Sequence, residues 1–468
     1  MQIKYLTVIA IILTACSVHK NKNYQSIISG IPWYTENGDN VSAHGANIIK
    51  EGDKFYLFGE YKNNHNNRFE GFSCYSSSDL MNWKFESIAL PPNQSGRLSG
   101  AECIGERPKV MKCPSTGEFI MYMHADSDNY RNPAVEYAVS KNITGPYEYK
   151  GRLMFGDTYI RRWDMGTFQD DDGTGYVILH HGDIYKLAND YKSVTEQVLK
   201  HDKTLRTESP AVFKYDGTYY WIGSGLTGWE RNDNHYFTAK SLAGPWTERG
   251  AVAPEGSLTW NSQSTYVFPV VGNKTTTFMY MGDRWSFPKQ RATATYVWQP
   301  LVFNGDEISM PTYHESWTVD VETGEWEDVP LKPSYEISYN DDAVSYEGSW
   351  ADSEGDNTTC KRANTKDATV SISFKGSRIA LRGVASLDCG YGHIMIKNSK
   401  GETVHDTWVD MYSNKTVEGL QYMSPVLPQG EYILTFSPTQ SHWYWTEKSG
   451  KQWGSKDTFI SFSKALVF

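Results

Sequence analysis

Four polar residues recur at one position of a repeated strand pattern. They lie in the segments "GERPKVM", "RRWDMGTF", "TESPAVF" and "NSQSTYVF", just before or within a short apolar strand. The four residues are Glu106, Asp164, Glu208 and Gln263. Their shared registration predicts that the side chains converge on one pocket, although their sequence positions are far apart. Carboxyl groups gathered in this way can perform acid–base chemistry, such as the cleavage of a glycosidic bond.

Two of these carboxyl groups are expected to have different protonation states. Burial, or a neighbouring carboxylate, raises the pKa of a carboxyl group so that it keeps its proton near neutral pH. We expect Glu208 to be the proton-donating acid, and Asp164 to raise its pKa and orient it. Asp164 also fits a plain turn residue, because Asp170 to Asp172 form an ordinary hairpin-turn sequence just after it.

The elements that must position these residues are short strands in five similar units. Aromatic-rich apolar runs begin close after Gly52, Gly117, Gly173, Gly217 and Gly272. Each run follows another short apolar strand, which is typical of a hairpin, and further strands follow in several units. Repetition of such units predicts a five-bladed β-propeller over residues 30–330.

The last part of the chain has a different pattern. After a Pro-marked linker, residues 335–468 contain alternating strands with Gly turns, which predict a β-sandwich of the jelly-roll type. The expected fold class is therefore all-β, a propeller followed by a sandwich. The segment "QSHWYWTEKSGKQW", residues 440–453, is rich in aromatics and suits either a sugar-binding platform or a buried seam between domains.

The N-terminal residues have the pattern of a lipoprotein signal peptide. A positive Lys4 precedes the apolar stretch Leu6 to Leu13, and the lipobox Leu13-Thr14-Ala15-Cys16 follows. We expect cleavage of residues 1–16, lipidation of Cys16, a polar tether over residues 17–29, and anchoring to the outer membrane in a bacterial cell envelope. A plain secretory peptide is the alternative.

Composition excludes some partners and leaves other questions open. The 468 residues carry a net charge of −10 without a basic stripe, which excludes nucleic acid as a partner. Aromatics make up 14% of the chain, which suits sugar stacking or a packed all-β protein. A monomer is expected. No cofactor is expected to be required, and a structural calcium or other ion is compatible with the sequence.

Cysteine spacing gives no further site. No paired CxxC spacing occurs, so a zinc site is not expected. Cys103 with Cys113, and Cys360 with Cys389, form either disulfides or pairs of free buried thiols.

The order of motifs resembles glycoside hydrolase family 43, and within it the exo-β-1,3-galactanase group. The motifs are "AHG", "FGEY", "ERPKV", "DMGTFQDDDG", "ESPAVFKYDGTYY", "SGLTGW", "SQSTYV" and "DRW", within residues 30–326. The resemblance implies a five-bladed propeller and inverting hydrolysis by an acid, a pKa-modulating Asp and an Asp base. Glu208 matches the acid and Asp164 the modulator.

The sequence departs from most of the family at the base. Residues 43–47, "AHGAN", hold no carboxylate where an Asp is expected. The galactanase group shares this absence, and its "SQST" Gln is thought to hold the water, in one view as the imidic acid tautomer. Gln263 falls there, and Glu106 matches a second essential carboxylate that supports Gln263 or the sugar 2-hydroxyl. Alternatively, Gln263 holds a loop or a sugar hydroxyl, or His44 contributes.

The same resemblance implies further pocket residues. These are Glu60, Arg107, Tyr130, Thr227, Trp229 and Arg284. Trp229 suits stacking beneath galactose, with a core Trp as the alternative. Three histidines, His124, His180 and His181, are candidates for the central channel, where they bind water or a metal or have structural roles.

These observations favour an exo-acting inverting hydrolase that releases galactose from β-1,3-galactan backbones of arabinogalactan-type glycans. One alternative is an α-L-arabinofuranosidase or β-xylosidase of the same family. Another is a catalytically inactive, surface-anchored glycan-binding lipoprotein, which the missing Asp favours and the intact Glu208, Asp164 and Glu106 oppose.

Overall fold

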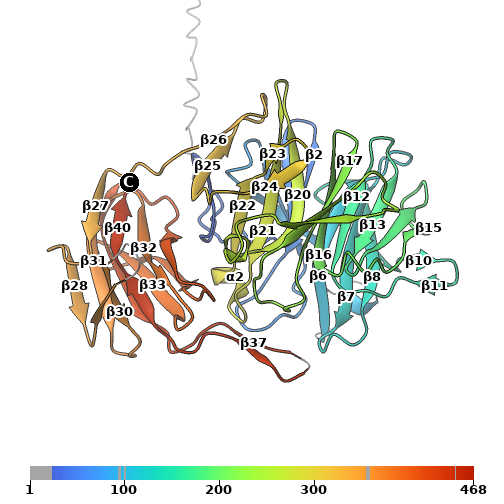
Figure 1. The fold of residues 1–468 in the computed structure, drawn as a ribbon. Helices are drawn as coiled ribbons and strands as arrows, with labels where there is room; N and C mark the ends of the chain where they lie inside the picture. The colour runs from blue at the N-terminus through green and yellow to red at the C-terminus, as the bar shows by residue number, and fades with distance from the viewer. Residues whose placement is uncertain (1–23, 93–95, 100–101, 355–358, 448) are drawn as a thin grey trace, which may run out of the picture.

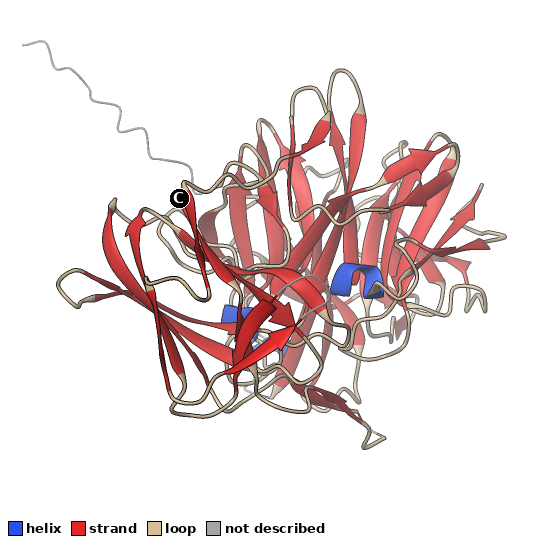
Figure 2. Ribbon diagram, turned by 60° about the vertical axis from the view of Figure 1, so that its left-hand side comes forward, coloured by secondary structure: helices blue, strands red, loops and turns tan. Residues whose placement is uncertain are grey.

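A computed structural model describes residues 24–92, 96–99, 102–354, 359–447 and 449–468. The structure is all-β, and its helices are short turns (Figure 2). They are η1 (Arg97–Ser99), α1 (Leu258–Asn261) and α2 (Gln290–Thr293). No helix within these ranges is long and apolar enough to cross a membrane. The expected signal peptide and the lipidated Cys16 lie outside the described residues, so they stay predictions.

Five sheets follow one another along the first part of the chain (Figure 1), antiparallel throughout except for the pairing of β10 with β15 in the third. The first is β2 (His44–Glu51), β3 (Lys54–Glu60), β4 (Phe72–Ser77) and β5 (Lys84–Leu90). The second is β6 (Cys103–Lys112), β7 (Phe119–Ser127), β8 (Ala134–Ser140) and β9 (Glu148–Arg152). The third holds β12 (Met165–Gln169), β13 (Gly175–Leu179), β14 (Asp183–Leu187) and β15 (Val194–Leu199), extended by β10 (Met154–Phe155) and β11 (Thr158–Tyr159).

The remaining two sheets complete the series. The fourth is β16 (Glu208–Tyr215), β17 (Thr218–Ser224), β18 (His235–Ala239) and β19 (Thr247–Ala251). The fifth is β20 (Gln263–Val271), β21 (Thr276–Arg284) and β22 (Thr295–Pro300). The first strands of the five sheets contact each other in a cycle, β2 with β6, β6 with β12, β12 with β16, β16 with β20, and β20 with β2. The starts of these strands are therefore brought together.

Two small sheets follow in the same half of the molecule. One pairs β23 (Val302–Asn304) with β24 (Glu307–Ser309), and the other joins β1 (Ile27–Ile28), β25 (Ser316–Val319) and β26 (Trp326–Asp328). The pairing of β1 with β25 corrects the predicted tether over residues 17–29. Residues 24–29 are not a tether, because Tyr24, Ile27 and Ile28 are buried in the hydrophobic core.

The C-terminal part contains two larger sheets. One is β27 (Tyr335–Ser338), β40 (Lys464–Val467), β32 (Ile379–Ala385) and β35 (Val417–Met423). The other is β28 (Val344–Glu347), β31 (Thr369–Gly376), β36 (Gly430–Pro438), β33 (Tyr391–Asn398) and β34 (Thr403–Asp410). One buried cluster takes side chains from both, including Leu381 and Val467 from the first and Ile372 and Leu434 from the second.

Smaller C-terminal elements and a shared core join the two parts. The elements are the sheet β29 (Ala351–Glu354), β30 (Thr359–Ala363) and β39 (Ile460–Phe462), and the hairpin β37 (Tyr444–Thr446) and β38 (Gln452–Gly454). Leu420 and Leu466 of the C-terminal part belong to the same core cluster as Trp298 and Trp317 of the first part. Burial of this shared apolar surface stabilises the two parts against each other.

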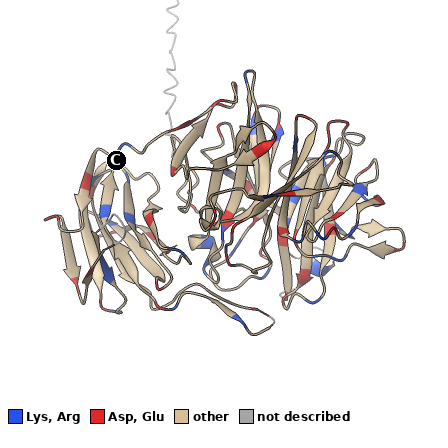
Figure 3. Ribbon diagram, viewed as in Figure 1, with Lys and Arg blue, Asp and Glu red and all other residues tan. Residues whose placement is uncertain are grey.

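Charged residues are distributed over both parts of the fold, and the cysteines of the described ranges form no disulfides. Figure 3 shows Lys and Arg interspersed with Asp and Glu in both parts. The five cysteines of the described ranges are free and buried, so the disulfide alternatives are not formed. They are Cys74, Cys103, Cys113, Cys360 and Cys389.

Candidate active site

A cavity of about 380 Å³ lies where the first strands of four sheets begin. It is lined by the four residues of the repeat registration, Glu106, Asp164, Glu208 and Gln263. It is also lined by four of the further predicted residues, Glu60, Arg107, Tyr130 and Trp229. The four side chains that share one position in the repeated strand pattern therefore lie together in the structure.

Unusual backbone geometry follows the functional position in several of these strands. Gly45, Arg107 and Ser209 directly follow His44, Glu106 and Glu208, and they have positive φ angles of 62°, 52° and 55°. The register of each hairpin also shifts at this point. Bulges of this kind redirect side chains beside active sites, and the left-handed backbone of the two non-glycine residues is a local strain that the site must hold in place.

The first repeat needs glycine at this position. A Cβ atom on Gly45 would lie 2.4 Å from Oε1 of Glu60. That oxygen accepts a hydrogen bond of 2.9 Å from the backbone N–H of Arg107. The space that a side chain would occupy is therefore already used by the contact between Glu60 and the second sheet.

The Arg107 guanidinium joins three other sheets at the cavity. Its Nη2 donates to Oε1 of Gln263 at 2.8 Å and to Oγ of Ser209 at 2.6 Å. The same atom lies 3.1 Å from Oδ2 of Asp164. Ser209 in turn donates its backbone N–H and its hydroxyl to Asp164, at 3.1 and 2.8 Å. Arg107 thereby fixes the positions of Gln263 and Asp164 relative to each other, and it also holds Ser209, the residue that follows Glu208.

The two carboxyl groups of the acid pair have opposite pKa shifts. Burial raises the pKa of Glu208 well above its usual value, and the negative charge of Asp164 raises it further. Burial also acts to raise the pKa of Asp164, but the Arg107 guanidinium, His180 and the Ser209 hydrogen bond together outweigh it and lower that pKa. The two shifts favour a protonated Glu208 and an ionised Asp164, which are the states needed for general acid catalysis.

All four hydrogen-bonding positions of the Gln263 amide are used. Its Nε2 donates to Oε1 of Glu208 at 3.2 Å and to Oγ of Ser224 at 3.0 Å. Its Oε1 accepts from Arg107 at 2.8 Å and from the indole N–H of Trp285 at 2.9 Å. Because Arg and Trp only donate, these contacts favour the amide over the imidic acid tautomer. A water reaches Oε1 only by replacing one of these two donors.

Glu106 is an ionised carboxylate with spare acceptor capacity. Its Oε1 accepts from Asn67 at 2.7 Å and Tyr130 at 2.6 Å, and Oε2 lies 3.1 Å from Nδ1 of His124. Burial acts to raise its pKa, but the contacts with His124 and other donors outweigh it and lower the pKa to about 2. Since each carboxylate oxygen has two acceptor positions, Oε2 keeps one for a water or a sugar hydroxyl.

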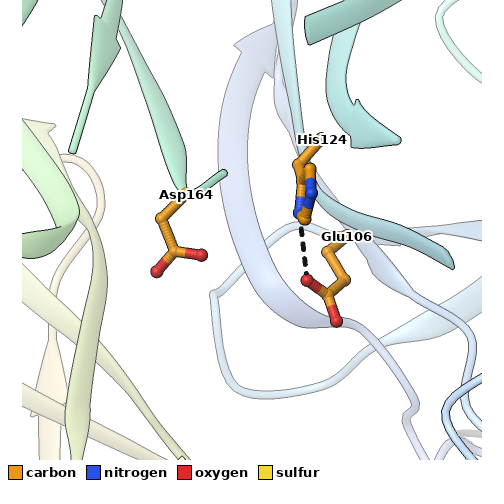
Figure 4. A group of neighbouring side chains, drawn as sticks. All are labelled: Glu106, His124 and Asp164. Carbon is orange, nitrogen blue, oxygen red and sulfur yellow. Dashed lines mark hydrogen bonds and ion pairs between the residues drawn. The ribbon is translucent and has the colours of Figure 1, made fainter. Parts of the chain in front are cut away.

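Glu106, His124 and Asp164 form the one group in the described ranges with the residue types and spacing of a metal site (Figure 4). Their ligand atoms lie within 4.8 Å of one another. His124, however, lies between Glu106 and Asp126, at 3.1 and 3.2 Å. Burial acts to lower its pKa, but these carboxylates raise it to about 9, so the ring offers protons rather than a lone pair. The expected structural ion stays a prediction.

Two of the residues expected in the pocket do not line the cavity. Thr227 stabilises its own loop, because its hydroxyl donates to the Glu230 carbonyl at 2.7 Å and accepts from Asn232 at 2.6 Å. Arg284 does not line the cavity, and it donates to the backbone carbonyls of Trp260 and Asn261. The predicted substrate contacts of both residues are corrected to structural ones.

The histidine candidates also separate by position. His44 is buried against Tyr296, with ring centroids 4.4 Å apart, and its Nδ1 lies 3.0 Å from Asp283. It does not line the cavity, so the alternative that it contributes to the chemistry has no support. His124 and His180 do line the cavity. His181 does not, and stacks on His180 with centroids 4.1 Å apart.

Arg284 holds a left-handed turn immediately before Gln263. The four residues of α1, Leu258 to Asn261, have φ angles between 52° and 59°. A left-handed turn costs about 1–2 kcal/mol per non-glycine residue, so other contacts must hold it. Arg284 donates to the carbonyls of Trp260 at 3.2 Å and Asn261 at 3.0 Å. This turn sets the direction in which β20 begins, and so places Gln263.

Several cavity residues were not found by sequence reasoning. They are Lys62, Trp163, Leu226, Gly228, Trp285, Trp445, Glu447 and Ser449. Trp285 belongs to the "DRW" motif, and this residue lines the cavity while the neighbouring Arg284 does not. Trp445 and Glu447 lie in the aromatic C-terminal segment. This segment is far along the chain from the other cavity residues, so no local sequence pattern indicates its contact with the cavity.

Comparison with known proteins now places the chain. Residues 40–280 match glycosyl hydrolases family 43. The chain belongs to this family of glycoside hydrolases. Family 43 membership agrees with the acid pair described above, since glycoside hydrolysis requires a proton donor for the leaving oxygen. No curated protein matches the chain in the corresponding sequence search.

Solved structures similar to this family 43 enzyme include exo-β-1,3-galactanases. That of Phanerochaete chrysosporium is 29% identical, with a TM-score of 0.69 over 95% of this chain and 100% of that one. That of Clostridium thermocellum is 27% identical, with a TM-score of 0.61 over 86% and 99%. A putative exo-β-1,3-galactanase of Bifidobacterium bifidum is 34% identical, with a TM-score of 0.57 over 60% and 95%.

The acid pair predicts a pH effect for Asp164→Asn. Removing the negative charge of Asp164 lowers the pKa of Glu208, so Glu208 loses its proton at lower pH. The basic limb of the pH profile of kcat/KM is therefore expected to move to lower pH. Asp171→Asn, whose side chain is 84% exposed, is the control. An unmoved basic limb in Asp164→Asn would contradict the assigned pair.

The left-handed turn predicts the effect of Arg284→Ala. Loss of its hydrogen bonds to buried carbonyls is expected to lower the free energy of unfolding by about 2 kcal/mol or more, measured in urea. Because Arg284 does not line the cavity, the activity loss should lie in kcat with little change in KM. The control is Arg249→Ala, which removes a surface ion pair with Asp306. A raised KM with unchanged stability would restore Arg284 to substrate binding.

Proposed function

We propose that this family 43 glycoside hydrolase is an exo-acting, inverting enzyme that releases galactose from β-1,3-galactan backbones of arabinogalactan-type glycans. The observation that carries the proposal is the convergence of Glu208 and Asp164 on one cavity with opposite pKa shifts, Glu208 bonded to Gln263 and Asp164 paired with Arg107. The substrate is supported by the similar Phanerochaete enzyme, a variant of which was crystallised with β-1,3-galactotriose.

The proposed fold is a five-bladed β-propeller followed by a β-sandwich. The propeller is supported by five consecutive sheets whose first strands contact each other in a cycle. The sandwich is supported by the buried cluster shared between the two C-terminal sheets. In this arrangement the cavity lies at one end of the propeller axis, where loops from different blades meet.

In the proposed reaction Glu208 is the general acid. Its proton passes to the leaving O3 of the next galactose as the bond between that oxygen and C1 breaks. Asp164 stays ionised and keeps Glu208 protonated before the reaction, while the N–H of Gln263 orients the Glu208 carboxyl at 3.2 Å. General acid catalysis of this kind contributes about 10²- to 10⁴-fold to the rate.

In the same step a water attacks C1 from the opposite face. We assign its orientation to Oε1 of Gln263, after the water replaces one of the two present donors. Trp285 is the donor to be replaced, because Arg107 is also held by Asp164 and Ser209. A neutral amide is a weak base, so the water's proton goes to Glu106, which is ionised and keeps a free acceptor position. The water oxygen forms the new bond to C1, which inverts the anomeric centre.

Product analysis tests the function. Incubation with β-1,3-galactan is expected to release galactose alone, and NMR of the first product should show the α-anomer because inversion changes the β-linkage. Release of internal oligosaccharides would exclude exo action, and a first β-anomer would exclude inversion. Activity on arabinofuranosides or β-xylosides without activity on galactan would favour the alternative enzymes. Binding of galactan without any product would favour the inactive lipoprotein.

Two variants separate the roles of acid and water-orienting group. Glu208→Gln is expected to lower kcat/KM on β-1,3-galactotriose by about 10²- to 10⁴-fold, yet to keep activity on β-galactosyl fluoride, because fluoride leaves without a proton. Gln263→Ala is expected to lose activity on both substrates, since both need the water. Glu148→Gln, with a side chain 74% exposed, is the control. Full activity of Gln263→Ala would exclude its assigned role.

A further inference from the structure

The hairpin β37–β38 of the C-terminal part reaches the cavity of the catalytic part. Figure 1 shows β37 extending away from the C-terminal sheets and toward the first part of the chain. Three residues of this segment, Trp445, Glu447 and Ser449, line the cavity together with Glu208 and Gln263. The cavity is therefore built from two parts of the chain that are distant in sequence.

Trp445 spans two loops of the catalytic part. Its ring is parallel to that of Trp229, with centroids 4.9 Å apart and an interplanar angle of 6°. It also meets Tyr130 edge-on, with centroids 6.2 Å apart. Tyr130 is the residue whose hydroxyl donates to Glu106. The hairpin is thus packed on the residues that surround the reacting groups.

A second set of contacts ties the Trp229 loop to the C-terminal part. The Tyr412 hydroxyl donates to Oε2 of Glu230 at 2.5 Å. The Arg231 guanidinium lies over the rings of Tyr412 and Trp443, 5.6 and 5.3 Å from their centroids. These buried contacts fix the position of the loop that carries Trp229. The hairpin therefore packs on a loop that other residues of the C-terminal part also hold in place.

The lining residues differ in depth. Glu106 and Gln263 are 8% and 4% exposed and lie at the floor. Leu226 is 44% exposed, Trp445 is half-buried and Ser449 is exposed, so the C-terminal residues lie at the mouth. A terminal sugar that reaches the floor leaves its linked neighbour at the mouth, because the chain extends out through the opening.

We infer that the β37–β38 hairpin forms the binding subsite for the galactosyl unit next to the bond that is cleaved, with Trp445 as its main contact. This inference rests on the proposed function. The axial 4-hydroxyl of galactose leaves one face with C–H groups alone, which suits contact with an indole ring. Glu447 is oriented by the Trp453 indole N–H at 2.6 Å and the Ser449 hydroxyl at 2.9 Å, and its carboxylate accepts a sugar hydroxyl.

The experiment compares two substrates that differ in this unit. β-1,3-Galactotriose occupies both the floor and the mouth, whereas β-galactosyl fluoride occupies the floor alone. Trp445→Ala is expected to lower the ratio of kcat/KM for the triose to kcat/KM for the fluoride by about tenfold or more, because the triose alone loses the aromatic contact at the mouth. Trp445→Phe should recover most of the loss. Tyr444→Ala, an exposed neighbour on the same hairpin that does not line the cavity, is the matched control.

Equal losses on the two substrates, or no loss on the triose, would overturn the inference. Thermal melting shows whether Trp445→Ala folds, and if it does not, Glu447→Gln decides by the same ratio of the two kcat/KM values. Failure of the proposed function looks different, because the unaltered protein then releases no galactose from the triose. In that case the inference falls with it.

Discussion

The site depends on one buried cation, the guanidinium of Arg107. Through a single nitrogen it contacts Asp164, Ser209 and Gln263, which come from three different sheets. Its backbone N–H binds Glu60 from a fourth. The charge of this cation lowers the pKa of Asp164 and so favours its ionised form, and the negative charge of Asp164 in turn raises the pKa of Glu208. Arg107 therefore influences both the positions of the site residues and the protonation states of Asp164 and Glu208.

The backbone is shaped to keep this group in place. Arg107 and Ser209 both adopt left-handed φ angles, and α1 adds a left-handed turn before Gln263. Such conformations persist only where surrounding contacts compensate for them. Here the compensating contacts are also the functional ones, since the Ser209 N–H and hydroxyl both bind Asp164. The same hydrogen bonds therefore hold the strained backbone and position the functional side chains. The register shifts lie beside the pocket positions because they redirect these side chains.

Much of this arrangement could be predicted from the sequence, because strand registration repeats. Glu106, Asp164, Glu208 and Gln263 were placed together by their common position before a short strand, and the cavity contains all four. Thr227 and Arg284 could not be placed in this way, because motif order does not show whether a side chain faces the cavity or the backbone behind it. Trp445 could not be predicted for a different reason, because its contact partner Trp229 lies more than two hundred positions away along the chain. Long-range packing of this kind leaves no local periodicity in the sequence.

The charges of the cavity are largely cancelled within it. Lys62 pairs with Glu60, Arg107 with Asp164, and His124 with Glu106. A galactan carries no charge. It therefore interacts with these residues as ion pairs at short range, and not with a net charge of the cavity. Its binding should then depend little on ionic strength, because salt screens long-range fields and leaves short buried contacts almost unchanged. The paired charges provide strong hydrogen-bonding partners for sugar hydroxyls. They create no net field that would attract acidic or basic polymers.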